Sequence, residues 1–461
     1  MGKIAEDEKV DFVILWVDGN DPEWQASKAK YTADKGQDAS ANRYREWENL
    51  KYWFRGVEKF APWVNNVYFV TCGHYPEWLN LEHPKLRFVR HEDFIPKECL
   101  PTFSSRPIDM NLHRIEELSE HFVYFNDDMF LIDKVEKTDF FRNGKPCDML
   151  CEYPLGFSGK TYVFSHTMVN NMNLMGKYFK RKQIKKDLKK KMLSPKYGKY
   201  AIYNWIMYML PFPNLIGVLS HHLPMANLKS TYQEFWEKEP EILNETISHR
   251  FRSISDVNQF VFRYWNLFRG NFEPFNVLKL GKMYAVGADN RELYDTIRNQ
   301  KKRMICINDT CTQEEFEEAK PKVIECFEHI LPEKSEYATS DDLFAYQAKV
   351  MKELIKENSF IVIGRGGDYV LKDYPYLVRV FVHSQYKDCL AHEMEIMQCS
   401  EKDAAERIAK TNKYRSDYYK HFTGREWMDA RNYDLVLDTS RYTYQQCAEM
   451  IEAIVAERMK D

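Results

Sequence analysis

Two adjacent carboxylates interrupt an apolar run in the first third of the chain. Asn126, Asp127 and Asp128 lie between His-Phe-Val-Tyr-Phe and Met-Phe-Leu-Ile. Such a run predicts a buried strand, and paired carboxylates at its end need a compensating cation in an apolar setting. Asp127 and Asp128 are therefore candidate ligands for a divalent metal, Mg²⁺ or Mn²⁺, that holds a phosphate or diphosphate. The alternative is an acidic turn closed by local side-chain to backbone hydrogen bonds.

A second group of titratable residues lies in the middle of the chain. His221 and His222 precede Leu-Pro-Met, and Ser248-His-Arg-Phe-Arg-Ser253 follows downstream. Adjacent residues point to different sides of a strand or helix, so we expect one histidine to act alone. An imidazole with a pKa of about 6.5 is a suitable base near neutral pH. The alternative for this histidine is a hydrogen-bonded position in the core.

The elements that position these residues begin with a buried strand over residues 11–17, which ends in the turn Asp18-Gly-Asn-Asp-Pro22. An amphipathic helix is predicted over 46–60, and short strands over 67–71 and 86–89. Strands alternating with helices predict an α/β fold with a Rossmann-like, mostly parallel sheet and right-handed crossovers. Ligands of such sheets bind at the carboxyl ends of the strands.

The middle of the chain predicts helical insertions, over about residues 166–300. Lys177–Lys191 concentrates positive charge and is interpreted as a solvated helix face, or alternatively as a peripheral contact with a membrane or an anionic polymer. Residues 200–209 predict a buried helix.

Composition sets further bounds. The 461 residues are 44% hydrophobic and 29% charged, which suits two or three globular domains. The net charge of −3 argues against nucleic-acid binding through bulk charge. The amino terminus lacks a signal-peptide core, and no apolar run reaches the roughly 20 residues of a spanning helix, so we expect a cytoplasmic protein without a transmembrane segment. Ten cysteines without a Cys-x-x-Cys pair predict reduced thiols.

Several motifs together resemble the Stealth family, in the family's order, over about residues 9–337. The first two conserved regions are matched by Asp11-Phe-Val-Ile-Leu-Trp-Val-Asp-Gly, Arg43-Tyr-Arg, Leu100-Pro-Thr-Phe-Ser-Ser, His113-Arg and Tyr124-Phe-Asn-Asp-Asp. The third region is similar to His222-Leu-Pro with Ser248-His-Arg-Phe-Arg, and the fourth to Cys306-Ile-Asn-Asp.

The resemblance implies a hexose-1-phosphate transferase. Such an enzyme passes a sugar phosphate from a nucleotide sugar, typically a UDP-sugar such as UDP-N-acetylglucosamine, to a hydroxyl of a glycan in capsule or exopolysaccharide synthesis. His222 matches the family's catalytic histidine, and Arg252 matches an arginine suited to phosphate oxygens. With Asp128 they form the expected catalytic set. Further expected donor contacts are Trp16, Asp18 and Gly19, with a core position as the alternative for Trp16. Arg43, Arg45, His113 and Arg114 are weaker candidates for donor contact and could equally form structural ion pairs.

Residues 341–461 resemble the carboxyl-terminal part of a cytidylate-kinase-like domain, a smaller second α/β unit. Strand-like runs occur at 360–371 and 377–383. The chain has no Gly-x-x-x-x-Gly-Lys-[Ser/Thr] loop, so kinase activity is not expected. Gly364-Arg-Gly-Gly is interpreted as a tight strand-to-helix turn in a scaffold or homo-oligomerisation domain, with phosphate binding as the alternative.

Two other functions stay open on the sequence. One is a metal-dependent glycosyltransferase that moves the sugar without its phosphate. The other is a non-catalytic protein that binds nucleotide sugars. Retention of Asp127, Asp128, His222 and Arg252 argues against the second.

Overall fold

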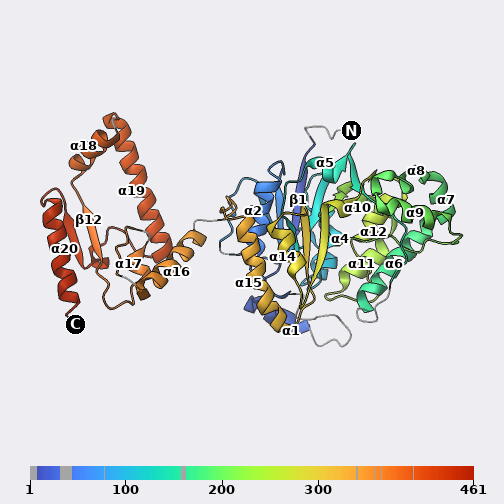
Figure 1. The fold of residues 1–461 in the computed structure, drawn as a ribbon, viewed down its shortest axis with the longest axis horizontal. Helices are drawn as coiled ribbons and strands as arrows, with labels where there is room; N and C mark the ends of the chain where they lie inside the picture. Colours follow the sequence, from blue (N-terminus) through green and yellow to red (C-terminus); the bar gives the residue numbers. More distant parts are fainter. Residues whose placement is uncertain are drawn as a thin grey trace. The chain divides into compact units, whose positions relative to one another are not determined.

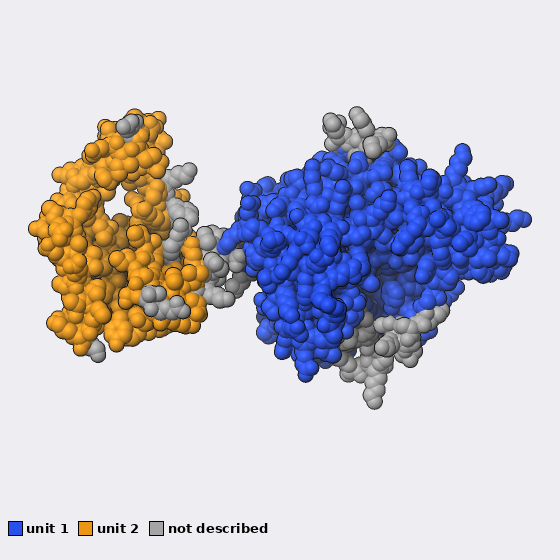
Figure 2. Space-filling view, viewed as in Figure 1, with its two compact units in different colours: residues 1–337 blue, residues 338–461 orange. Residues whose placement is uncertain are grey.

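The computed structural model describes residues 8–31, 44–76, 78–156, 162–338, 341–357, 359–364, 366–397 and 399–460. The chain divides into two compact units, residues 1–337 and 338–461 (Figure 2). None of the helices in these described ranges is long and apolar enough to cross a membrane. All ten cysteines are free thiols.

Unit 1 is built on a five-stranded sheet with the order β3-β2-β1-β4-β8. Its strands are β1 (Val10–Leu15), β2 (Val67–Thr71), β3 (Leu86–Arg90), β4 (His121–Phe125) and β8 (Met225–Leu228). The first four pair in parallel, whereas β8 runs antiparallel to β4. This order confirms the Rossmann-like α/β fold, with a point between β1 and β4 where the direction of winding reverses.

The central strand β1 is buried on both faces, as a continuous apolar run in a parallel sheet requires. Phe12 and Ile14 face one apolar core, which is covered by α2 (Leu50–Phe60), α14 (Arg291–Arg298) and α15 (Gln313–Ile330). Val13 and Leu15 face the other core. The helices over that second face are α4 (Ser105–Asn111), α6 (Tyr162–Tyr178), α10 (Lys229–Lys238), α11 (Pro240–Ser248) and α12 (Phe260–Phe268), as Figure 1 shows.

A second, three-stranded sheet adjoins the first and has the order β10-β11-β5. Its strands are β5 (Met129–Leu131), β10 (Gly281–Val286) and β11 (Met304–Asp309). The chain therefore leaves the main sheet after β4 and enters the second sheet at β5. The three residues between these strands are Asn126, Asp127 and Asp128.

The remaining elements of unit 1 are shorter or lie at its periphery. A small sheet pairs β6 (Phe141–Arg142), β7 (Lys145–Asp148) and β9 (Glu273–Pro274). The other helices are α1 (Pro22–Tyr31), α3 (His91–Phe94), α5 (Lys137–Phe140), α7 (Arg181–Asp187), α8 (Lys189–Met192), α9 (Lys199–Met209) and α13 (Val277–Leu280).

One helix of this group differs from expectation. The apolar stretch 200–209 forms α9, but only Asn204 and Met207 of this helix are buried. The prediction of a buried helix is therefore wrong, because apolar side chains occupy two opposite faces and only one of them meets the core.

Unit 2 contains the parallel pair β12 (Val380–His383) and β13 (Leu435–Asp438). Its helices are α16 (Asp341–Glu357), α17 (Gly367–Val370), α18 (Tyr386–Met397), α19 (Glu401–Thr423) and α20 (Tyr444–Arg458). The run 377–383 yields a strand, as predicted. Residues 360–363 do not form one, because the described part of unit 2 offers this segment no paired strand, and Ile361 and Ile363 are 92% and 91% exposed.

Candidate active site

A cleft of about 820 Å³ lies at the carboxyl ends of β1 and β4, the point where the order of winding reverses. The sheet order explains its position, because the crossovers that follow β1 and β4 leave in opposite directions and open a crevice between them. Six of the residues predicted from the sequence line this cleft. They are Trp16, Arg45, Asp127, Asp128, His222 and Arg252.

The acidic turn forms one wall of the cleft. The Met129 backbone N–H donates to the Asn126 carbonyl at 3.1 Å, which closes the turn between the two sheets. The Ile307 N–H donates to the Asp128 carbonyl at 2.8 Å and ties the turn to β11. Two sheets thus fix the backbone of the carboxylates, and this rigid support is what a binding site needs.

Asp128 is the centre of a polar cluster. Its Oδ2 lies 3.1 Å from His222 Nε2 and accepts a hydrogen bond from Cys306 Sγ at 3.2 Å. The histidine reaches this point because β8 is antiparallel to β4, so the residues that precede β8 lie beside the carboxyl end of β4. Burial alone lowers the pKa of His222, but the Asp128 carboxylate outweighs this effect and raises it above its usual value.

Asp127 has a different environment. Its side chain is open to the cleft, yet protein surrounds that part of the cleft on several sides. Loss of hydration, together with the neighbouring charges of Asp128 and Glu46, raises the pKa of Asp127 to about 7. Glu46 also lines the cleft, and burial raises its pKa as well. The carboxyl groups of Asp127 and Glu46 are therefore harder to ionise in this cleft than in water.

The residues present fit a divalent cation. Asp128 Oδ1 is buried and has no hydrogen-bond partner among the described residues, so one carboxylate oxygen has spare bonding capacity. The ligand atoms of Asp128, His222 and Cys306 lie within 4.8 Å of one another. Burial and Asp128 raise the pKa of the Cys306 thiol well above its usual value, so this thiol donates to Asp128 and is a poor ligand. Asp127 and Asp128 offer the oxygen ligands that Mg²⁺ or Mn²⁺ prefers.

The two neighbouring histidines face different surroundings. His221 is buried, and its Nε2 lies 3.5 Å from Asp148 Oδ1. Asp148 is held by Arg263, whose Nε and Nη2 donate at 2.7 and 2.9 Å. Burial, with the Arg263 charge, lowers the pKa of His221. Part of His221 lines the cleft wall, but its ring is directed at a buried ion pair, whereas His222 contacts the acidic turn.

Arg252 lies in the loop between α11 and α12. This loop is fixed at both ends: the Phe103 N–H donates to the Arg250 carbonyl at 2.8 Å, and buried Arg106 forms an ion pair with Asp256. Arg106 also donates to the Ser253 carbonyl at 2.9 Å. The loop thereby presents Arg252 to the cleft, close enough for its charge to act on both His222 and Asp109.

The turn after β1 is held by a histidine that the sequence did not single out. His74, after β2, accepts a hydrogen bond from the Asp18 N–H at 2.9 Å through Nε2, and its Nδ1 lies 2.8 Å from Asp21 Oδ2. Trp16 packs against the same ring, with centroids 5.2 Å apart. A Cβ on Gly19 would lie 1.8 Å from the Tyr44 carbonyl oxygen, so this close approach requires glycine.

Of the three donor contacts expected after β1, only one residue lines the cleft. Trp16 lines it, whereas Asp18 lies beside the lining residue Glu46, whose pKa its charge helps to raise. Gly19 packs on Tyr44 and does not line the cleft.

Of the arginines and the histidine expected to contact the donor, some line the cleft and others do not. Arg45 lines the cleft but is paired with Asp309, with Nη1 and Oδ1 3.3 Å apart. His113 and Arg114 do not line it: they pack against Trp236 with ring and guanidinium distances of 5.8 and 4.9 Å. The structure therefore does not bring these two residues to the cleft, because the turn that carries them packs against α10. Arg43 lies outside the described residues.

Two further features, one behind the acidic turn and one in the cleft wall, have no clear signature in the sequence. Asp109 is fully buried behind the acidic turn and accepts a hydrogen bond from Tyr124 at 2.7 Å; burial raises its pKa to about 7. An aromatic wall is made by Trp24, Tyr44 and Phe103, with Trp24 centroids 4.9 and 5.7 Å from the other two. These three residues come from separate segments, so only the fold assembles them.

Two profiles of one protein family match the first part of unit 1. The profile of Stealth protein CR1, conserved region 1, matches residues 8–36, and that of Stealth protein CR2, conserved region 2, matches residues 43–148. The profile of the cytidylate kinase-like family matches residues 290–441. This match begins in unit 1 and ends in unit 2.

Curated relatives are similar over nearly their whole length. The capsular polysaccharide phosphotransferase WcwK of Streptococcus pneumoniae is 42% identical over 333 residues, which is 72% of this chain and 98% of the relative. The receptor polysaccharide phosphotransferase WefC of Streptococcus oralis is 39% identical over 336 residues, with 71% and 99% covered. The exopolysaccharide phosphotransferase cps2G of Lactiplantibacillus plantarum is 35% identical over 330 residues, with 71% and 96% covered.

Proposed function

The chain belongs to the Stealth family, as a sugar-phosphate transferase, and on this premise we propose that it transfers a hexose-1-phosphate from a nucleotide sugar to a hydroxyl of a glycan. The nucleoside monophosphate is the second product. The proposed donor is a UDP-sugar such as UDP-N-acetylglucosamine, and the proposed setting is capsule or exopolysaccharide synthesis in the cytoplasm, where free thiols stay reduced. The observation that carries the proposal is the cluster of Asp128, His222 and Arg252 in one cleft at the sheet's switch point.

Charge neutralisation is the first requirement of this reaction. Attack at the phosphorus of the sugar phosphate places negative charge on the diphosphate oxygens, and catalysis depends on groups already in place to meet it. Asp127 and Asp128 would hold a divalent cation, which supplies positive charge beside the diphosphate. Arg252 would donate from its planar fork to two phosphate oxygens.

A base for the acceptor hydroxyl is the second requirement. His222 Nε2 lies beside Asp128 Oδ2, so this nitrogen carries the proton and donates to the carboxylate. The other ring nitrogen, Nδ1, is then the atom that accepts the proton of the attacking hydroxyl. Asp128 holds the ring in one orientation and stabilises its charged form, as a carboxylate beside a catalytic histidine does.

Recognition of the donor is the third requirement. Trp24, Tyr44 and Phe103 offer ring faces at the cleft wall on which a nucleobase can stack. Trp16, which follows β1, lines the same cleft. A nucleotide sugar bound with its base on the aromatic wall would extend its diphosphate towards Asp127 and Arg252.

One experiment tests the proposal and its main alternative together. The protein is incubated with a panel of nucleotide sugars, a glycan acceptor and Mg²⁺ or Mn²⁺, and the released nucleotide is identified by chromatography. Release of a nucleoside monophosphate, with phosphorus-31 evidence of a sugar phosphodiester in the product, supports the proposal. Release of a nucleoside diphosphate would instead identify a glycosyltransferase and overturn it.

A further inference from the structure

The helix α9 presents an apolar face to solvent. Ile202, Trp205, Ile206 and Met209 are 68%, 56%, 50% and 64% exposed. Their spacing of three and four residues places them on one side of the helix, opposite the buried side chains of Asn204 and Met207. Single exposed apolar residues are ordinary on protein surfaces, but a contiguous row of four on one helix face marks an interaction site.

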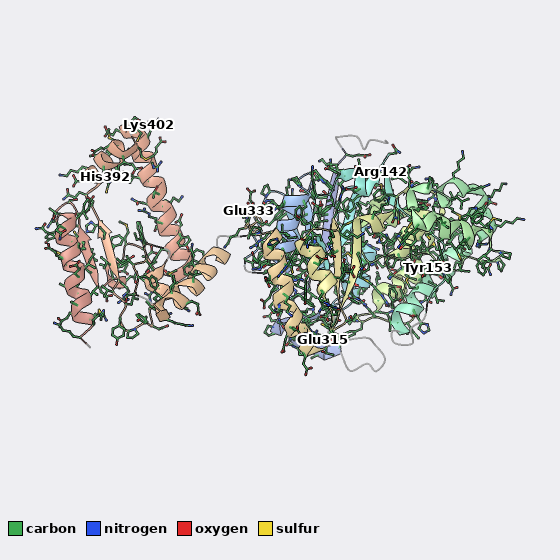
Figure 3. All side chains as sticks on the ribbon, viewed as in Figure 1. Arg142, Tyr153, Glu315, Glu333, His392 and Lys402 are labelled. Carbon is green, nitrogen blue, oxygen red and sulfur yellow. The ribbon has the colours of Figure 1, made fainter. Side chains whose placement is uncertain are left out.

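The inner face of α9 fixes the helix firmly to unit 1. Asn204 Nδ2 donates to the Leu150 carbonyl at 2.8 Å, and Arg181 donates to the carbonyls of Met207 and Leu210 at 2.6 and 2.9 Å. Tyr203 packs against Tyr153, which Figure 3 labels, with centroids 5.5 Å apart. The exposed face is therefore held in place by the fold and cannot turn inward.

The surface continues beyond the end of the helix. Leu210 and Phe212 are partly exposed in the following segment, and Arg181 covers one face of the Phe212 ring at 5.5 Å. The same segment then leads to Ser220 and His222 in the cleft wall. The apolar face is thus joined to the candidate active site by a short, ordered stretch of chain.

Positive charge flanks this face. The helices α7 and α8 lie beside α9 at one end of unit 1 (Figure 1), and they carry the exposed side chains of Lys182, Lys186, Lys189 and Lys190. None of these four lysines has an ion-pair partner within the described part of the chain, whereas Lys177, just before them, is paired with Glu239 at 2.9 Å. An apolar row beside unpaired lysines is complementary to a surface that is apolar inside and anionic outside.

We propose that α9 and the adjacent lysines of α7 and α8 dock unit 1 on the surface of an anionic lipid bilayer. The row of Ile202, Trp205, Ile206 and Met209 would enter the boundary between headgroups and acyl chains, with Trp205 at the interface that indole rings prefer. The lysines would lie over the anionic headgroups. This inference is independent of the proposed reaction, since none of the side chains that it uses lines the cleft.

The size of the face favours a bilayer over a second copy of the chain. An 11-residue helix is about 16 Å long and presents only a single row of side chains. A stable protein dimer buries roughly 800 Å² on each partner, which such a row does not supply by itself. An interfacial helix with adjacent lysines needs no such area, because apolar insertion and charge attraction act together.

The test is flotation of the full chain with lipid vesicles. One set is phosphatidylcholine alone, and in the other about a third of the lipid is phosphatidylglycerol. We expect flotation with the anionic vesicles and little with the neutral ones. The substitution Trp205→Ser should weaken the apparent affinity on the order of tenfold or more, and each alanine at Lys186, Lys189 or Lys190 should weaken it roughly fivefold.

Matched controls separate docking from damage. Lys402, which Figure 3 labels, and Lys413 are exposed lysines of unit 2, and Lys402→Ala with Lys413→Ala should leave flotation unchanged. Circular dichroism should give the same melting temperature for Trp205→Ser as for the wild type, because this side chain is largely exposed.

Three outcomes would overturn the proposal. The first is equal flotation with neutral and anionic vesicles. The second is undiminished flotation of Trp205→Ser with an unchanged melting temperature. The third is a dimer in solution that Trp205→Ser converts to a monomer while vesicle binding is absent, which would identify the face as a contact between copies. Release of nucleotide in a vesicle-free assay is measured separately, so failure of the docking proposal leaves the proposed reaction untouched, and the reverse also holds.

Discussion

His222 Nε2 lies 3.1 Å from Asp128 Oδ2, although the two residues are 94 positions apart in the chain. One precedes an antiparallel edge strand, and the other follows the strand that pairs with it. The contact joins the candidate base to the acidic turn. The same carboxylate is therefore proposed both to orient the base and to bind the metal ion.

Removal of the metal should stop turnover. If Asp127 and Asp128 hold a divalent cation, excess chelator should abolish nucleotide release, and Asp127→Asn or Asp128→Asn should lower it by orders of magnitude. The measurement is nucleotide release with and without added Mg²⁺ or Mn²⁺. Asp133→Asn, in the same segment but not lining the cleft, is the matched control and should stay near wild type. Full activity in chelator would exclude this role.

Loss of the imidazole at position 222 should act on the rate and not on donor binding. Removal of a general base typically costs on the order of 10² to 10⁴ in rate, so His222→Ala should lower kcat by about that factor. Donor affinity, measured by calorimetry, should change little. His221→Gln is the control, checked for folding because His221 is buried. A folded, inactive His221→Gln beside an active His222→Ala would show that the roles of the two histidines are reversed.

The guanidinium at position 252 should not be replaceable by an ammonium group. Lysine keeps the charge but cannot donate from two nitrogens in one plane, so Arg252→Lys should reduce kcat/KM. A loss of about tenfold or more corresponds to one charge-assisted hydrogen bond. Arg250→Lys is the matched control, because Arg250 lies two residues away and does not line the cleft. Equal activity of the two lysine variants would remove Arg252 from phosphate binding.

Acid should destabilise the fold through His91. This buried imidazole has a pKa lowered to about 3, chiefly by loss of hydration, whereas the unfolded value is about 6.5. The unfolded state therefore binds a proton that the folded state does not, and the free energy of unfolding falls as pH drops from about 6.5 towards 3. At pH 5 the loss from this group is about 2 kcal/mol.

Denaturant unfolding at several pH values tests this prediction. His91→Gln should flatten the decline between pH 6.5 and 5 relative to the wild type, whatever its effect on stability at pH 7. Parallel curves for the two proteins would show that His91 does not contribute. His113, whose pKa burial lowers to about 4, is expected to contribute a similar, separate decline.

The second unit should lack nucleotide kinase activity. The chain contains no phosphate-binding loop of the Gly-x-x-x-x-Gly-Lys-[Ser/Thr] type, so the purified protein should not transfer phosphate from ATP to CMP. The measurement is CDP formation by chromatography, against a buffer blank. CDP above that blank, abolished by heating the protein, would show that another loop binds the phosphates.

The sequence by itself determined the local chemistry. The apolar run of β1, the apolar residues before Asn126 and the amphipathic pattern over 46–60 each reflect periodicity and turn preferences that operate over a few residues. The order of strands and helices was enough to predict a parallel α/β sheet, and the adjacent carboxylates marked the edge of that sheet at which the cleft lies. The resemblance to the family motifs singled out His222 and Arg252, and both residues line the cleft. A motif can be found in the sequence even when its residues meet their partners only in the folded chain.

Tertiary structure alone decided which of these residues meet. Packing of the β4 turn between two sheets brought Cys306 to Asp128, and the antiparallel β8 brought His222 to the same oxygen. It placed His113 and Arg114 against Trp236, away from the cleft, although their sequence context resembled the other candidates. It also left one apolar face of α9 in solvent, because burial depends on whether a partner surface is present and not on the hydrophobicity of the helix. Contacts between distant segments depend on strand order and crossover direction, which no local pattern encodes.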